Sequence, residues 1–166
     1  CDEFGIVLIF DEVMAGFGRT GQWLALDNFG VAPDLITFAK GVNSGYVPAG
    51  GVMISQPIAE FFETRFFPGG LTYSGHPLAM AAIVATLDAM AEQGMVDNAR
   101  QVGQEVLAPG LQHLANRHEL IGEVRGLGLF WAIEFVSDRQ RKTPLTAAVV
   151  ARMKAAFQAR GLLTFT

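Results

Sequence analysis

Lys40 stands out among the residues that could do chemistry. It directly follows the apolar run Leu35–Ala39 and precedes a glycine-containing stretch, GVNSG. Burial beside a strand favours the neutral amine of a lysine, and a neutral amine can attack a carbonyl carbon to form a Schiff base. The alternative is a lysine at a strand end whose ammonium reaches water along its apolar stem. Position alone favours the second interpretation.

The position of Asp11 favours the Schiff-base interpretation of Lys40 over the surface lysine. It ends the apolar run Gly5–Asp11 (GIVLIFD), which reads as a strand buried on both faces. Ligands gather beyond the carboxyl ends of strands in α/β sheets, so we expect Asp11 and Lys40 to face one site. A carboxylate and a lysine together suit pyridoxal 5′-phosphate (PLP), because the acid keeps the pyridine nitrogen protonated and the lysine holds the aldehyde. Asp11 could instead cap a helix or form a plain salt bridge with Lys40.

The other two lysines have ordinary surroundings. Lys142 lies in a charged turn (DRQRKTP), and Lys154 lies on the polar side of the amphipathic stretch Thr146–Arg160. Both positions are typical of solvated surface charges.

The motif GFGRTG, residues Gly16–Gly21, matches G-x-G-x-x-G and raises the possibility of a dinucleotide site. Four residues separate the motif from Asp11, and Pro33 leaves no room for a long helix after it. The next strand also lacks an acidic residue at its end. We therefore favour a structural glycine loop.

The stretch GGLTYSGHP, residues Gly69–Pro77, precedes an alanine-rich segment that reads as a helix from His76 to Met90. The hydroxyls of Thr72 and Ser74, together with the free N–H groups of a helix start, would suit an anion. Ordinary helix capping is the alternative use of these hydroxyls.

The remaining pattern indicates an α/β protein. We expect strands at Leu35–Ala39 and Gly51–Ser55, antiparallel because the link between them is too short for a parallel crossover. A further helix is expected at Val96–His118, bent near Pro109, and then one bent or two short strands in IGEVRGLGLFWAIEFV. The predicted organisation is a large α/β domain part in residues 1–90, linking helices in 91–120 and part of a smaller α+β domain in 121–166.

Composition narrows the function. The 166 residues are 51% hydrophobic and 17% charged with a net charge of −4, which indicates a globular chain without the basic surface of a nucleic-acid binder. No stretch resembles a membrane span. The single cysteine, Cys1, excludes an internal disulfide and suggests a reducing compartment, the cytoplasm. The chain begins without Met only four residues before the apolar run GIVLIF and stops within GLLTFT, which reads as another strand, so we expect a piece of a longer protein.

Four segments together resemble class III (ω-amino acid type) PLP-dependent aminotransferases. They are LIFDEVMAGFGRTG, PDLITFAKGVNSGYVPAGGVMIS, GGLTYSGHPLAMAAIVATLDAM and VRGLGLFWAIEFV, in the family's order and across essentially the whole chain. The resemblance implies the fold type I architecture: a large α/β domain with a mostly parallel sheet and a small α+β C-terminal domain.

The resemblance also implies roles for particular residues. Lys40 matches the lysine that holds the cofactor aldehyde, and Asp11 matches the partner of the pyridine nitrogen. Val13 matches the residue that packs on one face of the ring. Thr72 matches a threonine that binds the cofactor phosphate of the neighbouring subunit, which implies a homodimer with a shared site. Arg125, in VRGLG, is expected to be structural.

The implied reaction is a ping-pong transamination between an amine or ω-amino acid donor and an oxo acid such as pyruvate or 2-oxoglutarate. The family's upstream phosphate loop, its aromatic ring-stacking residue and its downstream substrate-binding residues have no match here. We therefore expect this piece alone to bind PLP poorly and to lack turnover. A PLP-dependent aminomutase, a nicotinamide-binding domain and a non-catalytic fragment remain as alternatives.

Overall fold

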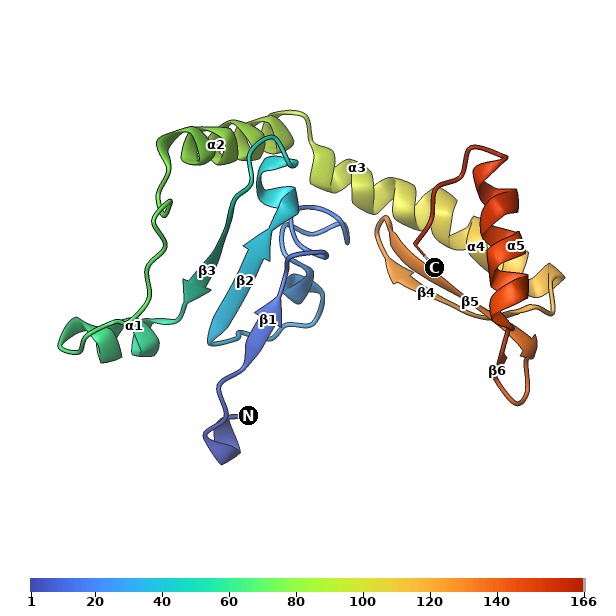
Figure 1. Ribbon diagram of the computed structural model, residues 1–166, viewed down its shortest axis with the longest axis horizontal. Coiled ribbons are helices and arrows are strands. Elements are labelled where there is room, and N and C mark those ends of the chain that lie inside the picture. The colour runs from blue at the N-terminus through green and yellow to red at the C-terminus, as the bar shows by residue number, and fades with distance from the viewer. Residues whose placement is uncertain (166) are drawn as a thin grey trace. The chain divides into compact units, whose positions relative to one another are not determined.

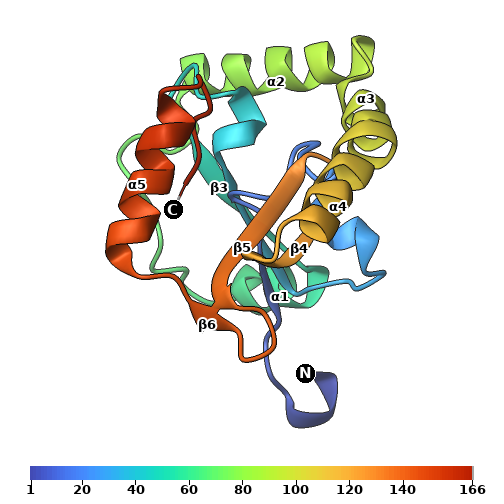
Figure 2. The same ribbon diagram turned by 90° about the vertical axis from the view of Figure 1, so that its right-hand side faces the viewer.

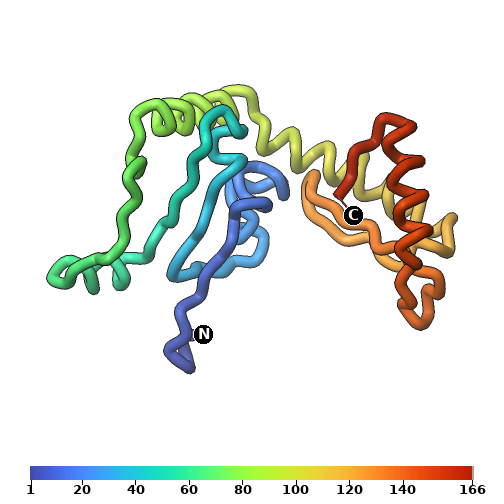
Figure 3. Tube along the Cα trace, viewed as in Figure 1, coloured from blue at the N-terminus to red at the C-terminus, as the bar shows by residue number. Residues whose placement is uncertain are grey.

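The computed structural model describes residues 1–165, which form two compact units. The first unit comprises residues 1–107 together with 126–130, and the second comprises 108–125 together with the chain from Trp131 onward. Each unit can be followed along the chain in Figure 1 and Figure 3. The division predicted from the sequence, into residues 1–90, 91–120 and 121–166, is a different one and stays a prediction.

A three-stranded sheet organises the first unit (Figure 1). It contains β1 (Ile9–Asp11), β2 (Leu35–Ala39) and β3 (Gly50–Ile54) in the order β1-β2-β3. β1 runs parallel to β2, with Asp11 opposite Thr37, whereas β3 runs antiparallel to β2. The antiparallel arrangement predicted from the short link is confirmed. The parallel pair places the carboxyl ends of β1 and β2 at the same sheet edge.

The first strand is shorter and more exposed than the sequence predicted. Residues 5–11 were expected to form a strand buried on both faces, but pairing starts only at Ile9, and Ile6 and Ile9 are 56% and 55% exposed. The backbone N–H of Leu8 donates to the Asp34 carboxylate at 2.8 Å instead of joining the ladder. β1 is an edge strand, and nothing within the described residues covers the outer side of these apolar residues.

Helices α1 (Gln56–Glu63), α2 (Pro77–Glu92) and α3 (Met95–Val102) complete the first unit. α2 begins at Pro77, whose missing N–H is no loss in a first turn, and extends two residues beyond the predicted Met90. Gly94, with φ of +60°, separates α2 from α3. A left-handed residue there lets the chain change direction without a side-chain clash.

The long helix predicted around Pro109 is interrupted just before the proline. α3 passes into a π-helical turn at Gly103–Leu107 and then into α4 (Ala108–Arg117). Pro109 has no N–H to donate to the carbonyl four residues earlier, which explains a change in hydrogen bonding at this place. Gly103 permits a close approach, because a Cβ there would lie 2.2 Å from the Gly128 carbonyl oxygen.

The second unit contains a second three-stranded sheet, seen in Figure 2. Its order is β4-β5-β6, with strands β4 (Ile121–Leu127), β5 (Phe130–Asp138) and β6 (Thr143–Pro144). The predicted strand region is therefore two separate strands rather than one bent strand. Helix α5 (Ala147–Gln158) packs Phe157 against Phe135 with a ring separation of 6.3 Å.

Among the described residues, no single helix is long and apolar enough to cross a membrane. The bent pair Pro77–Glu92 and Met95–Arg117 meets the requirement of length and composition only when both helices are taken together.

Candidate active site

Lys40 and Asp11 lie at the carboxyl ends of adjacent parallel strands, as the sequence predicted. Asp11 is the last residue of β1 and pairs in register with Thr37, and Lys40 directly follows β2. Both side chains are exposed at this edge. No ion pair joins Lys40 to Asp11 within residues 1–165, so the simple salt bridge is not formed. Because the amine and the carboxylate are not paired with each other, both can bind a ligand.

The backbone at Lys40 is held in an unusual conformation. Lys40 has φ of +43°, in the left-handed region that favours glycine, at the start of a 3-10 turn spanning Lys40–Asn43. Such a conformation costs about 1–3 kcal/mol and persists where the surroundings enforce it. Asn43 helps to enforce it: its side chain is 1% exposed, donates to the Val47 carbonyl and accepts from the Gly45 N–H. The functional role of this lysine stays a prediction.

The Lys40 amine contacts a thioether sulfur rather than a charged group. Its Nζ lies 2.8 Å from Sδ of Met14, and Met14 is 49% exposed. A thioether is only a weak acceptor, so the amine stays free for another partner. The Lys40 side chain is exposed and its upstream neighbours in β2 are only half-buried. The surroundings therefore match the open strand-end position rather than the buried one.

Hydrogen bonds to one of its oxygens orient the Asp11 carboxylate. Asp11 Oδ1 accepts from the Val13 N–H at 3.0 Å and from the Thr37 hydroxyl at 3.2 Å. Its Oδ2 accepts no hydrogen bond within residues 1–165 and is open to a donor from a ligand. Asp11 does not cap a helix, because the residues after it form turns, and its bond to the Val13 N–H stays within its own turn. The sequence analysis missed Thr37, whose only signal is its position opposite Asp11 in the paired strands.

The free groups of Lys40 and Asp11 match the groups that PLP would present to them. The cofactor offers an aldehyde and a protonated ring nitrogen, and the site offers an amine with no charged partner and a fixed carboxylate with an open oxygen. The half-buried Val13 lies two residues beyond Asp11. The donor and acceptor types therefore fit the group, although the roles of Lys40, Asp11 and Val13 stay predictions.

The neighbouring carboxylate of Glu12 is structural. Glu12 is 1% exposed and accepts from the N–H of Ala25 at 2.9 Å and from the N–H of Leu26 at 2.8 Å. These two N–H groups start the 3-10 turn Ala25–Asn28, so a buried anion satisfies both donors. Glu12 thereby ties the loop after β1 to the strand that carries Asp11. Nothing in the sequence distinguished it from the functional acid beside it.

Replacing Glu12 with glutamine should lower the free energy of unfolding by about 1–3 kcal/mol. The amide can accept only one of the two backbone N–H groups and turns its NH₂ toward the other. Chemical denaturation of the protein measures the effect, with the exposed Glu92→Gln on α2 as the matched control. Equal stability of the two variants would contradict the structural role of Glu12.

The glycine loop Gly16–Gly21 serves packing. A Cβ on Gly16 would lie 2.8 Å from the Glu12 carbonyl oxygen, and one on Gly21 would lie 2.8 Å from Cα of Arg100. Gly18 and Gly21 also have φ of +89° and +82°. The loop leads into the four-residue turn Ala25–Asn28, not into the long helix that a dinucleotide site needs. These contacts support the structural interpretation.

Thr72 is not hydrogen-bonded to the two strand ends in the part of the chain that the structure describes. It is exposed in the loop between α1 and α2, and no hydrogen bond within residues 1–165 joins it to Asp11 or Lys40. Helix α2 has His76 at its N-cap without a side-chain cap bond, so neither Thr72 nor Ser74 caps this helix. Ser74 instead accepts from the Leu71 N–H at 3.2 Å. The phosphate-binding role of Thr72 stays a prediction.

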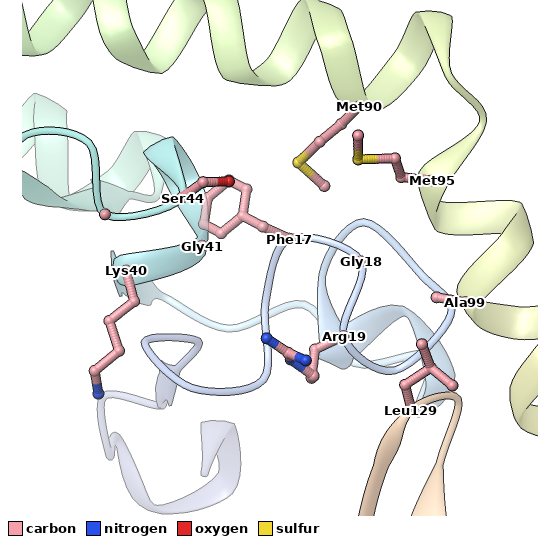
Figure 4. A pocket seen from close by; sticks show the side chains of 11 residues that line it. Phe17, Gly18, Arg19, Lys40, Gly41, Ser44, Met90, Met95, Ala99 and Leu129 are labelled. Carbon is pink, nitrogen blue, oxygen red and sulfur yellow. The ribbon is translucent and has the colours of Figure 1, made fainter. Parts of the chain in front are cut away.

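An open cavity of about 530 Å³ lies beside the lysine within the first unit (Figure 4). Lys40, Arg19 and Ser44 supply its polar side chains, and Phe17, Met90 and Met95 are among its apolar ones. A volume of this order accommodates a small organic molecule. Lys40 lines this space, while its amine extends toward Met14, which is not among the lining residues (Figure 4).

Comparison with known proteins gives a consistent result. The family model for class-III aminotransferases matches residues 1–166. The taurine–pyruvate aminotransferase of Rhodobacter capsulatus is 38% identical over 98% of this chain and 37% of its own length. The putrescine–pyruvate aminotransferase of Pseudomonas aeruginosa is 38% identical over 87% of this chain and 32% of its own length.

A solved structure is similar over nearly the whole chain. It is the taurine:2-oxoglutarate aminotransferase of Bifidobacterium kashiwanohense in complex with PLP and glutamate, which is 40% identical with a TM-score of 0.93. The match covers 99% of this chain and 38% of that one. The present chain thus spans about a third of the length of these proteins.

Proposed function

The chain belongs to the class III aminotransferases, a PLP-dependent family of fold type I, and from this premise we propose that the protein transfers an amino group. The donor is an amine or ω-amino acid, and the acceptor is an oxo acid such as pyruvate or 2-oxoglutarate. The names of the relatives support this class of reaction. Because the chain spans only a part of these relatives, the activity is proposed for the full-length protein.

One observation supports this proposal most strongly: the amine of Lys40 and the open oxygen of Asp11 lie at adjacent strand ends. Lys40 would bind the aldehyde of PLP, Asp11 would accept the N–H of its ring nitrogen, and Val13 would pack on the ring. When bound, PLP supplies an electron sink for the carbon that bears the amino group.

Proton transfer is the second task proposed for Lys40. With the donor bound, the Nζ amine would remove the proton from the donor carbon that bears the amino group and would hold it for return. The absence of a charged partner at Nζ suits this exchange, because the proton is not held by a permanent ion pair.

The assembly and location are also proposed. A homodimer would bring Thr72 of a second copy to the cofactor phosphate. We place the protein in the cytoplasm, in accord with its single cysteine.

Incubating the full-length protein and PLP with taurine or putrescine and with pyruvate should yield alanine in amounts that depend on both substrates. Alanine is measured by chromatography, and omission of either substrate is the control. Formation of an isomer of the donor, with no alanine, would contradict transamination and indicate an aminomutase.

A further inference from the structure

Met14 is the partner of the Lys40 amine. Lys40 Nζ lies 2.8 Å from Sδ of Met14, and within residues 1–165 it forms no ion pair and no further hydrogen bond. Figure 4 shows the Lys40 side chain extending away from Met90 and Met95, so these two methionines of the cavity wall do not share the contact. A chemical change at the Met14 sulfur therefore acts directly on the amine.

Backbone contacts hold the two side chains near each other. The Gly16 N–H donates to the Glu12 carbonyl at 2.9 Å, which closes the turn that carries the methionine. On the other side, a Cβ on Gly41 would lie 3.1 Å from Cβ of Phe17, so the residue after Lys40 packs closely against the same loop. The contact between sulfur and amine thus joins two fixed segments of the first unit.

Met14 is also open to solvent. It is 49% exposed, the highest value among the five methionines of residues 1–107, whereas Met90 is 7% exposed. The others in this range, exposed by 40–42%, are Met53, Met80 and Met95. Among the described residues, Met14 is the only methionine whose sulfur accepts a hydrogen bond. Oxidants dissolved in water reach an exposed thioether, and only at Met14 does its oxidation change the partner of an amine.

We propose that Met14 is an oxidation site through which a hydroperoxide switches off the Lys40 amine. A lone pair of Sδ attacks one peroxide oxygen and the O–O bond breaks, so the sulfur loses two electrons and the peroxide is reduced. With hydrogen peroxide, the transferred oxygen gives its proton to the departing hydroxide, which leaves as water, and the product is methionine sulfoxide. Reduction by two thiols removes the oxygen as water and forms a disulfide, so the change is reversible.

The new oxygen binds the amine more strongly than the sulfur does. A thioether sulfur is a weak acceptor, whereas the sulfoxide oxygen carries a partial negative charge and is a strong acceptor. A strong acceptor beside the amine favours the ammonium form, which has no lone pair to attack an aldehyde carbon. Oxidised Met14 therefore withholds Lys40 from PLP. Only this last step rests on the proposed function.

The test compares the full-length protein, with PLP removed, before and after treatment with hydrogen peroxide. Peptide mapping by mass spectrometry should locate methionine sulfoxide at Met14. Limiting acetic anhydride then reports the free amines: acetylation of Lys40 should become about three- to tenfold slower, while that of Lys142 and Lys154 changes by less than about twofold. Methionine sulfoxide reductase with a dithiol should restore the original rate at Lys40.

Two leucine variants isolate the sulfur of Met14. Met14→Leu keeps a similar apolar volume without a sulfur atom, so its Lys40 should be acetylated at the same rate with and without peroxide. Met53→Leu, which alters an exposed methionine of β3, should remain sensitive. A Met14 left intact while Met53 is oxidised, or a peroxide effect on Lys40 that is equal in the two variants, would overturn the proposal.

Returning PLP to the protein connects the modification to the cofactor. Absorbance of the Schiff base should appear about three- to tenfold more slowly after oxidation, in step with the acetylation of Lys40. An unchanged rate would overturn the control of Lys40 by Met14. If PLP forms no Schiff base with Lys40 even in the untreated protein, the proposed transamination is refuted, while the acetylation rates still decide the role of Met14.

Discussion

Replacement of Lys40 by alanine should lower the transamination rate of the full-length protein by about 10³-fold or more. Among the residues that the structure describes, no other lysine lines the cavity. Loss of Lys40 removes both the covalent hold on the aldehyde and the base that moves the proton. Alanine formation from pyruvate measures the rate.

Two controls separate this effect from misfolding. Lys154→Ala removes an exposed amine from α5 and should leave the rate within about twofold. Added methylamine should restore part of the activity of Lys40→Ala, because a free amine can take the place of the missing base. A Lys40→Ala protein with ordinary turnover and no added amine would refute the assignment of Lys40.

Replacement of Asp11 by asparagine should lower the rate by about 10²- to 10³-fold, the range seen when one electrostatic contact to the reacting group is lost. The amide still accepts from the Val13 N–H and the Thr37 hydroxyl through its oxygen, so the local turn is retained. It cannot supply the negative charge that keeps the ring nitrogen protonated. The rate should fall without a large change in protein stability.

Asp88→Asn is the matched control, since Asp88 is an exposed carboxylate on α2 away from the cavity lining. It should behave as the unaltered protein in both rate and thermal unfolding. Equal activity of Asp11→Asn and Asp88→Asn would show that the charge of Asp11 has no part in the reaction.

The sequence predicted the site better at the strand ends than around them. Lys40 and Asp11 could be placed together because parallel strands end at a common edge, and the antiparallel β3 followed from the length of its link. Thr37, Glu12 and Asn43 could not be assigned in this way. Their roles depend on strand register and on contacts across a loop, which leave no local pattern in the chain.

Burial was the property least accessible from the sequence. An apolar run such as GIVLIF indicates that a surface is to be covered but not which segment covers it, so β1 was expected to be buried and is exposed. The same limitation applies to Lys40, whose side chain is open while its backbone is strained. The strain at Lys40 arises from the turn after β2 and was not visible in residue types.

The central claim is that Lys40 holds the aldehyde of PLP, and reductive trapping tests it most directly. The full-length protein is treated with PLP and sodium borohydride, digested, and analysed by mass spectrometry. The account predicts a pyridoxyl adduct on the peptide containing Lys40. An adduct on Lys142 or Lys154 alone, or no adduct on any of the three lysines, would contradict it.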